Sequence, residues 1–507
     1  MGGDWDGWSA VPDLQSEWGN LKREAVKHAI ESQYADAGLS LPKNASLLDR
    51  PECRVVTVGH QLVLAGGPAF FHHKILTAIR VARGLSATSG RPVVPVFWMA
   101  SEDHDWKEIA TVHGRERAHS WQPKAAEVPH PVGRLGLEGL ADVLTAWAAD
   151  GLDNDVALGI RAELVASEER GETLSGLMRR WLHRWYGAEG LVVLDPQDKD
   201  LKRMAATLWA REFEGTGVLS ALVGTEAMDG AAHVRENNVF WLDDDSGRIG
   251  VIRDREEQTW RAGSNMFKTP QEGWDSWAES NASSCSPGVL LRPLYQEFLL
   301  QSAAVVLGPG EWKYWHQLPQ AFATHGLAFP SLRLRDHGVV VSAEVRGCGW
   351  TLSEGWLHDE EWDRWVLDRW MTEWGQEAEA HQRALHDWNK RVQTWAAEVS
   401  PELRGAVGAL EASTHKAWKQ WMGKMRKSLK ASRAKEWTAA RLGCASLMRK
   451  GSPQDRWANW HVLAGNAAGA WQAEWLSETE DLRTAVWVLE DLDQEKRDSK
   501  GNSSASN

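Results

Sequence analysis

The chain has 507 residues and a formal net charge of −13, with 43% hydrophobic and 25% charged residues, so its composition excludes a disordered protein. The longest apolar run, residues 92–100, is too short for a membrane span of about 20 residues, and the acidic start lacks a signal-peptide pattern. Four widely spaced cysteines exclude a disulfide scaffold, so we expect a cytoplasmic protein without a membrane partner.

Short β-branched runs predict five buried strands, each followed by a turn or helix signal. The predicted strands are Arg54–Val58, Val93–Met99, Leu191–Leu194, Val289–Leu291 and Ala304–Leu307. Helical segments are expected near residues 69–82, 173–186 and 200–214. Strands of this kind with helices between them indicate an α/β fold with a parallel sheet. Residues 129–190 and 215–285 are richer in Gly, Pro and Asp, and we interpret them as insertions into this core.

The first candidate site follows the first strand. A glycine-rich turn there leads into a helix, and such turns bind anions through backbone N–H groups and the helix dipole. A tight structural turn would explain the glycines, but not the polar side chains beside them. The candidate residues are Gly59, His60, Gln61, Gly66, Gly67, Pro68 and Lys74. His72 and His73 are interpreted as ordinary helix residues.

The second candidate site follows the second strand. Three carboxylates and a histidine stand together there, at Glu102, Asp103, His104 and Asp105. They can hold an ammonium group, act as a general base or bind a metal. The alternative is a solvated acidic turn in which Ser101 or Asp105 caps the next helix. Because no second ligand cluster stands out, we predict no metal.

Two further strand ends carry polar residues. Arg292 and Gln296 follow the fourth predicted strand, and Arg292 can clamp a carboxylate or phosphate, or form a structural ion pair. Gly308, Glu311 and Tyr314 follow the fifth, where a Gly-Pro-Gly turn lets a ligand approach the backbone.

Residues 353–450 show a different pattern. A heptad spacing predicts a long helix, a break at Ser400-Pro401 and a second long helix, together an antiparallel hairpin. The first seam is predicted at Trp374, Ala378, His381, Leu385, Trp388, Val392, Trp395 and Val399. The second is predicted at Val407, Leu410, Thr414, Trp418, Trp421 and Met425.

Charge along the hairpin suggests internal pairing. Residues 353–380 hold nine acids and two arginines, whereas residues 413–450 hold eleven basic residues and one glutamate. The basic stretch alone would fit a nucleic-acid-binding arm. We favour pairing of the two stretches and do not expect a nucleic-acid partner. Residues 454–490 are predicted as further helix, with a disordered polar tail.

Four motifs occur in a fixed order: V-T-V-G-H-Q-L-x-L-A-G-G-P-x-F-F-x-x-K, V-P-V-F-W-M-A-S-E-D-H-D-W-x-E-I, L-L-R-P-L-Y-Q-E and G-P-G-E-x-x-Y-W-x-Q-L. In this combination the chain resembles the bacillithiol-biosynthesis cysteine-adding enzymes, the BshC family, over residues 54–336. The chain departs from the family at Val58 and His60, where Thr and Gln are common.

The resemblance implies a Rossmann-like core over residues 1–352, related to class I synthetases and nucleotidyl transferases. It implies a coiled-coil arm over residues 353–450 that forms a homodimer; residues 451–507 would be helices on the core and a tail. It also implies a ligase that joins the carboxyl group of cysteine to the amine of glucosaminyl malate.

A carboxylate does not acylate an amine without activation, so we expect ATP or another nucleotide as a co-substrate. His60, Gly66, Gly67 and Lys74 would cradle its phosphates. Glu102, Asp103 and Asp105 would hold the amine, which one of them could deprotonate. Arg292 would bind the malate carboxylates, and His104 would shuttle a proton.

Two other functions fit the same residues: an RNA-binding protein with a synthetase-like core, and a non-catalytic dimeric scaffold. The 32 tryptophans, against 9 Phe and 4 Tyr, could form a stacking surface for bases or sugars. Because they are spread along the chain and often stand at helical spacing, we interpret them as packing residues.

Overall fold

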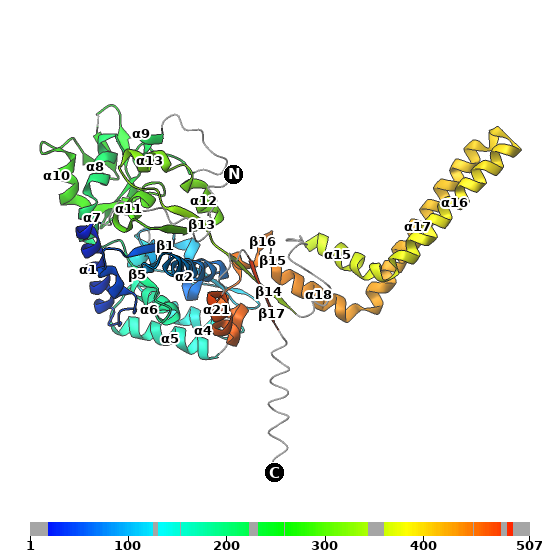
Figure 1. Cartoon of the computed structure of the whole chain (residues 1–507), viewed down its shortest axis with the longest axis horizontal. Helices are drawn as coiled ribbons and strands as arrows, with labels where there is room; N and C mark the ends of the chain where they lie inside the picture. Colours follow the sequence, from blue (N-terminus) through cyan, green and yellow to red (C-terminus); the bar gives the residue numbers. More distant parts are fainter. Residues whose placement is uncertain are drawn as a thin grey trace, which may run out of the picture. The chain divides into compact units, whose positions relative to one another are not determined.

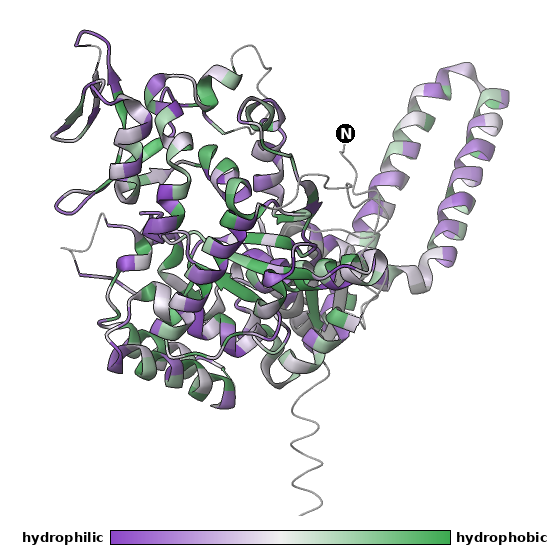
Figure 2. Cartoon of the chain, turned by 60° about the vertical axis from the view of Figure 1, so that its left-hand side comes forward, coloured by the Kyte–Doolittle hydropathy of each residue, from purple (hydrophilic) through white to green (hydrophobic). Residues whose placement is uncertain are grey.

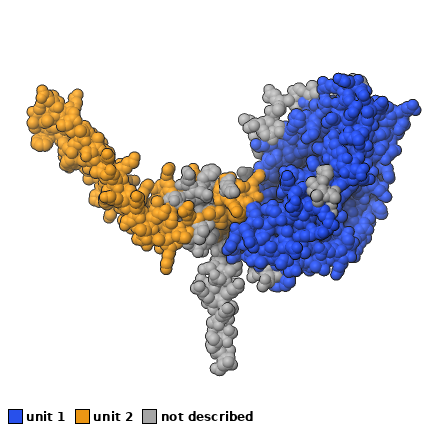
Figure 3. Space-filling model, turned by 180° about the vertical axis from the view of Figure 1, so that it is seen from behind, with its two compact units in different colours: residues 1–338, 458–485 blue, residues 339–457, 486–507 orange. Residues whose placement is uncertain are grey.

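The computed structural model describes residues 19–124, 130–152, 154–222, 232–257, 259–342, 359–449, 451–477 and 484–489. The predictions for the first residues, for residues 353–358 and for the polar tail lie outside these ranges. The chain divides into two compact units, residues 1–338 with 458–485 and residues 339–457 with 486–507 (Figure 3).

The first unit contains a parallel sheet of five strands in the order β13-β12-β1-β2-β5 (Figure 1). The strands are β1 (Arg54–His60), β2 (Val93–Met99), β5 (Val192–Leu194), β12 (Ala304–Leu307) and β13 (Ser331–Leu334). Both neighbours of β1 run parallel to it, with His60 opposite Met99 and Val58 opposite Val306. The carboxyl ends of β1, β2 and β12 therefore meet at one edge of the sheet.

Four of the five predicted strands are confirmed, and the α/β class with them. The strand predicted at Val289–Leu291 is wrong, because helix α11 (Leu291–Leu300) begins there. Leu290 and Leu291 are buried, and a short apolar run looks the same in a buried strand and in a buried helix start. The nearest strand is β11 (Cys285–Pro287), which belongs to a small antiparallel sheet.

Helix α2 (Ala69–Ser89) follows β1 and packs on β1 and β2. The helix predicted over residues 69–82 is confirmed and continues for two more turns. It ends at Gly90, whose φ of 66° is the left-handed conformation that glycine adopts without strain. In Figure 2 the strands of the central sheet are coloured as hydrophobic, consistent with their burial.

The other elements of the first unit come before, between and after these strands. Before β1 come α1 (Asn20–Asp36) and η1 (Ala45–Asp49), and η2 (Leu64–Gly66) follows β1. Between β2 and β5 come α3 (Trp106–Ile109), β3 (Thr111–His113), β4 (Ala118–Ser120), η4 (Val132–Arg134), α4 (Leu140–Ala148), α5 (Asn154–Glu169) and α6 (Leu174–Tyr186).

Between β5 and β11 come α7 (Lys199–Met204), α8 (Ala206–Glu214), α9 (Val218–Leu222), β6 (Val239–Asp243), β7 (Gly247–Gly250), β8 (Ile252–Asp254), β9 (Thr259–Ala262), β10 (Asn265–Phe267), α10 (Gly273–Asn281) and η5 (Ala282–Ser284). Strands β6 and β7 form one antiparallel sheet with β11, and β8, β9 and β10 form another. After β12 come α12 (Pro309–Trp315) and α13 (Pro319–Thr324). The helix predicted over residues 200–214 is interrupted at Ala205.

The second unit contains β14 (His337–Ser342, which begins in the first unit), α15 (Asp359–Met371), η7 (Thr372–Trp374), α16 (Gly375–Val399), η8 (Pro401–Leu403), α17 (Arg404–Ser432), α18 (Ala434–Leu447), β15 (Met448–Arg449), β16 (Ser452–Pro453) and α19 (Gln454–Trp457). Its core joins β14, α15 and α18 through Val339, Val341, Val366, Trp370 and Trp437. Asp368 pairs with Arg426, so acidic and basic stretches meet here as expected.

The hairpin of α16 and α17 breaks at Ser400-Pro401 as predicted, but its inner face differs from the predicted seam. Asn389 and Ala396 are buried, whereas Trp388 and Trp395 are 39% and 67% exposed. Asn389 hydrogen-bonds Thr414 across the hairpin. The apolar stripe of α16 is wider than one helix contact, so packing against α17 covers only its Asn389 side.

The prediction of helix throughout residues 454–490 is wrong at its end. Helices α20 (Trp460–Ala464) and α21 (Ala468–Ser477), with η9 (Gly465–Ala467) between them, agree with it. Thr484–Leu489 instead forms strand β17 beside β14. The run of Val, Trp and Thr there favours a strand. Among the described helices, none has the length and apolarity needed to cross a bilayer.

Candidate functional site

The candidate site lies where β1, β2 and β12 end. Gln61 follows β1, Asp103 follows β2, and Glu311 lies in the first turn of α12, just after β12. The sheet register aligns these strand ends, so residues separated by more than 200 positions become neighbours. Most of the motif residues thus lie at one edge of the sheet.

Lys74 is a buried residue that links two strand ends at this edge of the sheet. Its ammonium donates to the Gly59 carbonyl and pairs with the Glu311 carboxylate, and its side chain is only 2% exposed. Burial lowers the pKa of Lys74, and the charge of Glu311 opposes this shift. Glu311 also accepts the Gly308 N–H at 2.8 Å. Two of the three ammonium protons are engaged by these partners.

The glycine-rich turn has an unusual backbone. Ala65, Gly66 and Gly67 have φ values of 46°, 78° and 54°, all in the region that favours glycine. A Cβ at Gly66 would lie 2.4 Å from His72 Nε2, and one at Gly67 would lie 2.7 Å from Val63 Cβ. Both glycines are therefore required by backbone conformation and by close packing.

A residue far along the chain holds this turn. The Asn459 side-chain amide donates to the carbonyls of Ala65 at 3.0 Å and Gly67 at 2.9 Å. The Ala69 N–H, the first of α2, bonds the Ala458 carbonyl. Asn459 was not predicted as a site residue, because nothing local in the sequence shows that it returns to the first strand.

Asp103 has the most partners at the site. Its carboxylate accepts the Gln61 amide at 2.7 Å and the His104 backbone N–H at 2.9 Å. Arg248 lies 3.6 Å and Arg292 3.8 Å away. Burial acts to raise the pKa of Asp103, but Arg292, the Gln61 hydrogen bond and Arg248 outweigh it, so the pKa is lowered. Asp103 is thus held as a carboxylate that these donors engage.

Arg248 is a second site residue that was not predicted. It comes from β7, inside the segment interpreted as an insertion, and its side chain is 4% exposed. Its guanidinium bonds Ser286 Oγ, the Pro287 carbonyl and His104 Nδ1, and lies over the Phe240 ring. Burial, followed by the charge of Arg292, lowers the pKa of Arg248 to about 10. In the sequence, Arg248 is marked only by its position within a short run of strand-forming residues.

The other residues of the acidic turn have separate surroundings. Glu102 is buried and pairs with Lys202 of α7, so its charge is already balanced. Asp105 is exposed and precedes α3, but its side chain makes no capping bond. Ser101 Oγ bonds the Asp195 carboxylate instead of a helix end. The structure therefore brings Asp103 and His104 to the cluster and pairs Glu102 elsewhere.

Helices α11 and α12 supply the remaining candidates. Arg292 is 25% exposed, and its contact with Asp103 is long. Gln296 donates to the Glu297 carboxylate at 2.8 Å, and its amide oxygen lies 3.6 Å from where a Gly59 Cβ would be. Burial, and after it the Glu311 charge, raises the pKa of Tyr314. Gly308 starts α12, with Pro309 next to it. No cluster of three or more metal-ligating side chains occurs among the described residues.

Comparison with known proteins identifies relatives of this chain. The family described as "Bacillithiol biosynthesis BshC, N-terminal Rossmann-like domain" matches residues 9–336. Proteins named "Putative cysteine ligase BshC" are similar in Thermus thermophilus (31% identity over 325 residues), Salinibacter ruber (30% over 338) and Flavobacterium johnsoniae (28% over 336). These alignments cover 61–64% of this chain and 61–62% of each relative, less than two thirds of the relatives' length.

Proposed function

The chain belongs to the BshC family, and from this membership we propose that it forms an amide between the carboxyl group of cysteine and the amine of glucosaminyl malate, a step of bacillithiol biosynthesis. The proposal rests on the family match together with the cluster around Asp103. All four motifs that carry the match lie within the matched region.

The main structural support for this proposal is the charge balance at Asp103. Two guanidinium groups, Arg248 and Arg292, face this single carboxylate. Arg248 is buried and has three other acceptors, whereas Arg292 is partly exposed with one long contact. A positive charge is therefore left over, and an arginine fork suits a carboxylate. In this proposal Arg292 binds a malate carboxylate of the acceptor.

Activation of the cysteine carboxyl is the second part of the proposal. An unactivated carboxylate does not react with an amine, so ATP or another nucleotide would convert it to a mixed anhydride with phosphate. The remaining Lys74 proton would bind the phosphate charge. Holding the amine about 3–3.5 Å from the activated carbonyl would supply much of the rate.

Incubation of the purified chain with cysteine, glucosaminyl malate and ATP tests the proposal. We expect a product with the mass of the two substrates less one water, absent without ATP. Arg292→Met should raise KM for glucosaminyl malate about 10-fold or more, and Arg255→Met, at an exposed arginine, should not. Absence of product with every nucleotide, together with a salt-dependent shift of tRNA, would instead favour the RNA-binding alternative.

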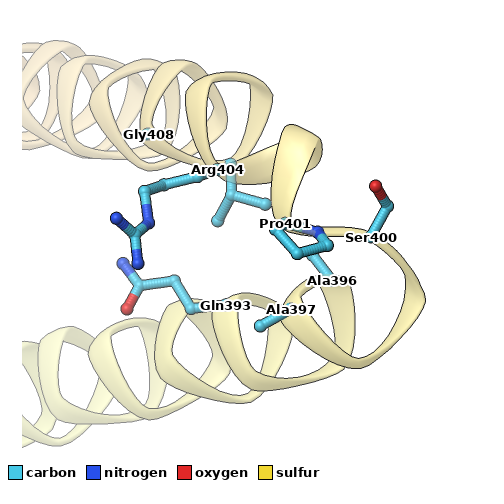
Figure 4. A pocket seen from close by; sticks show the side chains of 8 residues that line it. Gln393, Ala396, Ala397, Ser400, Pro401, Arg404 and Gly408 are labelled. Atoms are coloured by element: carbon cyan, nitrogen blue, oxygen red, sulfur yellow. The ribbon is translucent and has the colours of Figure 1, made fainter.

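We also propose that the hairpin joins two copies of the chain. Trp388, Trp395, Val399, Leu410 and Trp421 are exposed apolar residues on α16 and α17. Near the turn, the two helices enclose a cavity of about 560 Å³. Figure 4 shows Gln393 and Arg404 pointing into it from opposite helices. A second hairpin would cover this surface, and burying it would favour association.

A further inference from the structure

The protonation of His60 is defined by its neighbour. Its Nδ1 lies 2.8 Å from the Gln61 carbonyl oxygen. A carbonyl only accepts, so Nδ1 carries the hydrogen and Nε2 of the neutral ring keeps a lone pair. Phe70 and Phe71 pack against the ring, with centroids 5.3 and 5.2 Å away, and hold its orientation. His60 therefore offers a proton acceptor.

His104 has the opposite arrangement. Arg248 Nη1 lies 3.1 Å from His104 Nδ1. The Asp103 carboxylate lies farther from this nitrogen, at 3.6 Å, beyond hydrogen-bond distance. A guanidinium only donates, so Nδ1 carries the lone pair and Nε2 carries the hydrogen. The Phe240 ring lies beside His104, with centroids 6.0 Å apart, and also under the Arg248 guanidinium. The His104 side chain is 41% exposed, so its Nε2 hydrogen is accessible to a ligand.

One residue links the two histidines. The Gln61 backbone carbonyl accepts from His60, and its side-chain amide donates to Asp103, next to His104. Charged groups that act on His60 are Lys74, Glu311 and Arg335, and those beside His104 are Asp103 and Arg248. Burial, followed by the charge of Lys74, lowers the pKa of His60 to about 4, which keeps its ring neutral near pH 7.

We propose that His60 and His104 are a matched acceptor and donor for amide formation, with Arg248 as the residue that positions His104. This inference rests on the proposed function, with a nucleoside triphosphate as the activating co-substrate. The amine lone pair forms the C–N bond at the activated carbonyl. The C–O bond to the phosphate leaving group breaks, and its electrons leave with that oxygen. The amine proton passes to His60 Nε2, while His104 Nε2–H donates a hydrogen bond to the carbonyl oxygen as it becomes negative.

The tautomers are measured directly, without activity, by long-range ¹H–¹⁵N NMR of the full chain labelled at histidine. We expect Nδ1–H for His60 and Nε2–H for His104 at pH 7. Arg248→Met should abolish the single His104 tautomer, while Arg255→Met should leave it intact. An Nδ1–H tautomer or an imidazolium at His104 in the unmodified chain would overturn the inference.

The turnover rates of variants provide a second test of this inference. His104→Leu should lower kcat about 100-fold, with His104→Gln partly restoring it, because glutamine keeps an N–H near the Nε2 position. His60→Ala should lower kcat at least about 100-fold with KM nearly unchanged. Arg248→Met should lower kcat and change its pH profile. Equal rates for Leu and Gln at position 104 would refute the donor role. If the unmodified chain makes no amide, the proposed function fails; if it makes amide but the tautomers are reversed, only this inference fails.

Discussion

Lys74 and Glu311 stand 237 positions apart and form an ion pair that joins the end of β1, the helix α2 and the start of α12. Lys74 also donates to Gly59, and Glu311 accepts from Gly308, so the pair connects the backbone at two strand ends. A cation proposed for ligand binding thus also stabilises the sheet edge on which the site is built.

Lys74→Ala should therefore abolish product formation and also reduce stability. Removing the ammonium leaves the Glu311 carboxylate and the Gly59 carbonyl without a donor, at a cost of about 1–3 kcal/mol in the free energy of unfolding. Urea unfolding measures this cost. Lys74→Ala combined with Glu311→Ala should cost less than the sum of the two single changes. Full additivity would mean that the two side chains do not stabilise each other.

Sequence patterns predicted the part of the fold that depends on local order. The runs at Val93–Met99 and Ala304–Leu307 match strands β2 and β12 residue for residue, because their valines favour strands. Gln61 and Asp103 were correctly predicted to lie at strand ends. Which of the neighbouring acids faces the cluster was not predictable, since Lys202, the partner of Glu102, is 100 positions away.

Gly66→Ala should be more destabilising than Gly90→Ala. Both glycines have positive φ, at 78° and 66°, so each substitution incurs a similar backbone strain of about 1–2 kcal/mol. Only at Gly66 would the new Cβ also meet His72, since nothing lies within 4 Å at Gly90. The difference in the free energy of unfolding between the two variants measures the packing term. Equal losses would show that the turn can move away from His72.

Glu297 should make stability depend on pH. Burial raises its pKa from 4.5 to about 7, so the folded state holds a proton that the unfolded state releases between these values. The free energy of unfolding should thus fall by roughly 3 kcal/mol as the pH rises from about 4.5 through 7. Glu297→Gln cannot titrate and should flatten this slope, whereas Glu279→Gln, at an exposed position, should not. A parallel slope for Glu297→Gln would contradict the raised pKa.

Arg248 and Asn459 were missed for the same physical reason. Arg248 lies in a segment that reads as an insertion, and Asn459 lies beyond the hairpin, yet both bond to residues near the ends of β1 and β2. Their partners are defined by tertiary folding alone. The prediction of the hairpin seam was wrong for a different reason. The heptad pattern located the apolar stripe of α16, but could not show which side of this stripe faces α17.

The hairpin provides the last prediction, which concerns the proposed dimer. Leu385 and Val392 are half-buried beside α17, so charged residues there would disrupt the hairpin itself. Trp395 and Val399 are 67% and 62% exposed, so Trp395→Glu with Val399→Glu should leave the fold intact. If two copies associate through this stripe, burying charge there should convert dimer to monomer.

Light scattering coupled to size-exclusion chromatography measures this change, and Lys390→Glu, at an exposed position of α16, is the matched control. The control should remain dimeric, and the urea unfolding of both variants should match the unmodified chain. A double variant that stays dimeric with unchanged unfolding would show that association uses another surface. A chain that is monomeric before any substitution would remove the proposed dimer altogether, and the exposed tryptophans would then need a different partner.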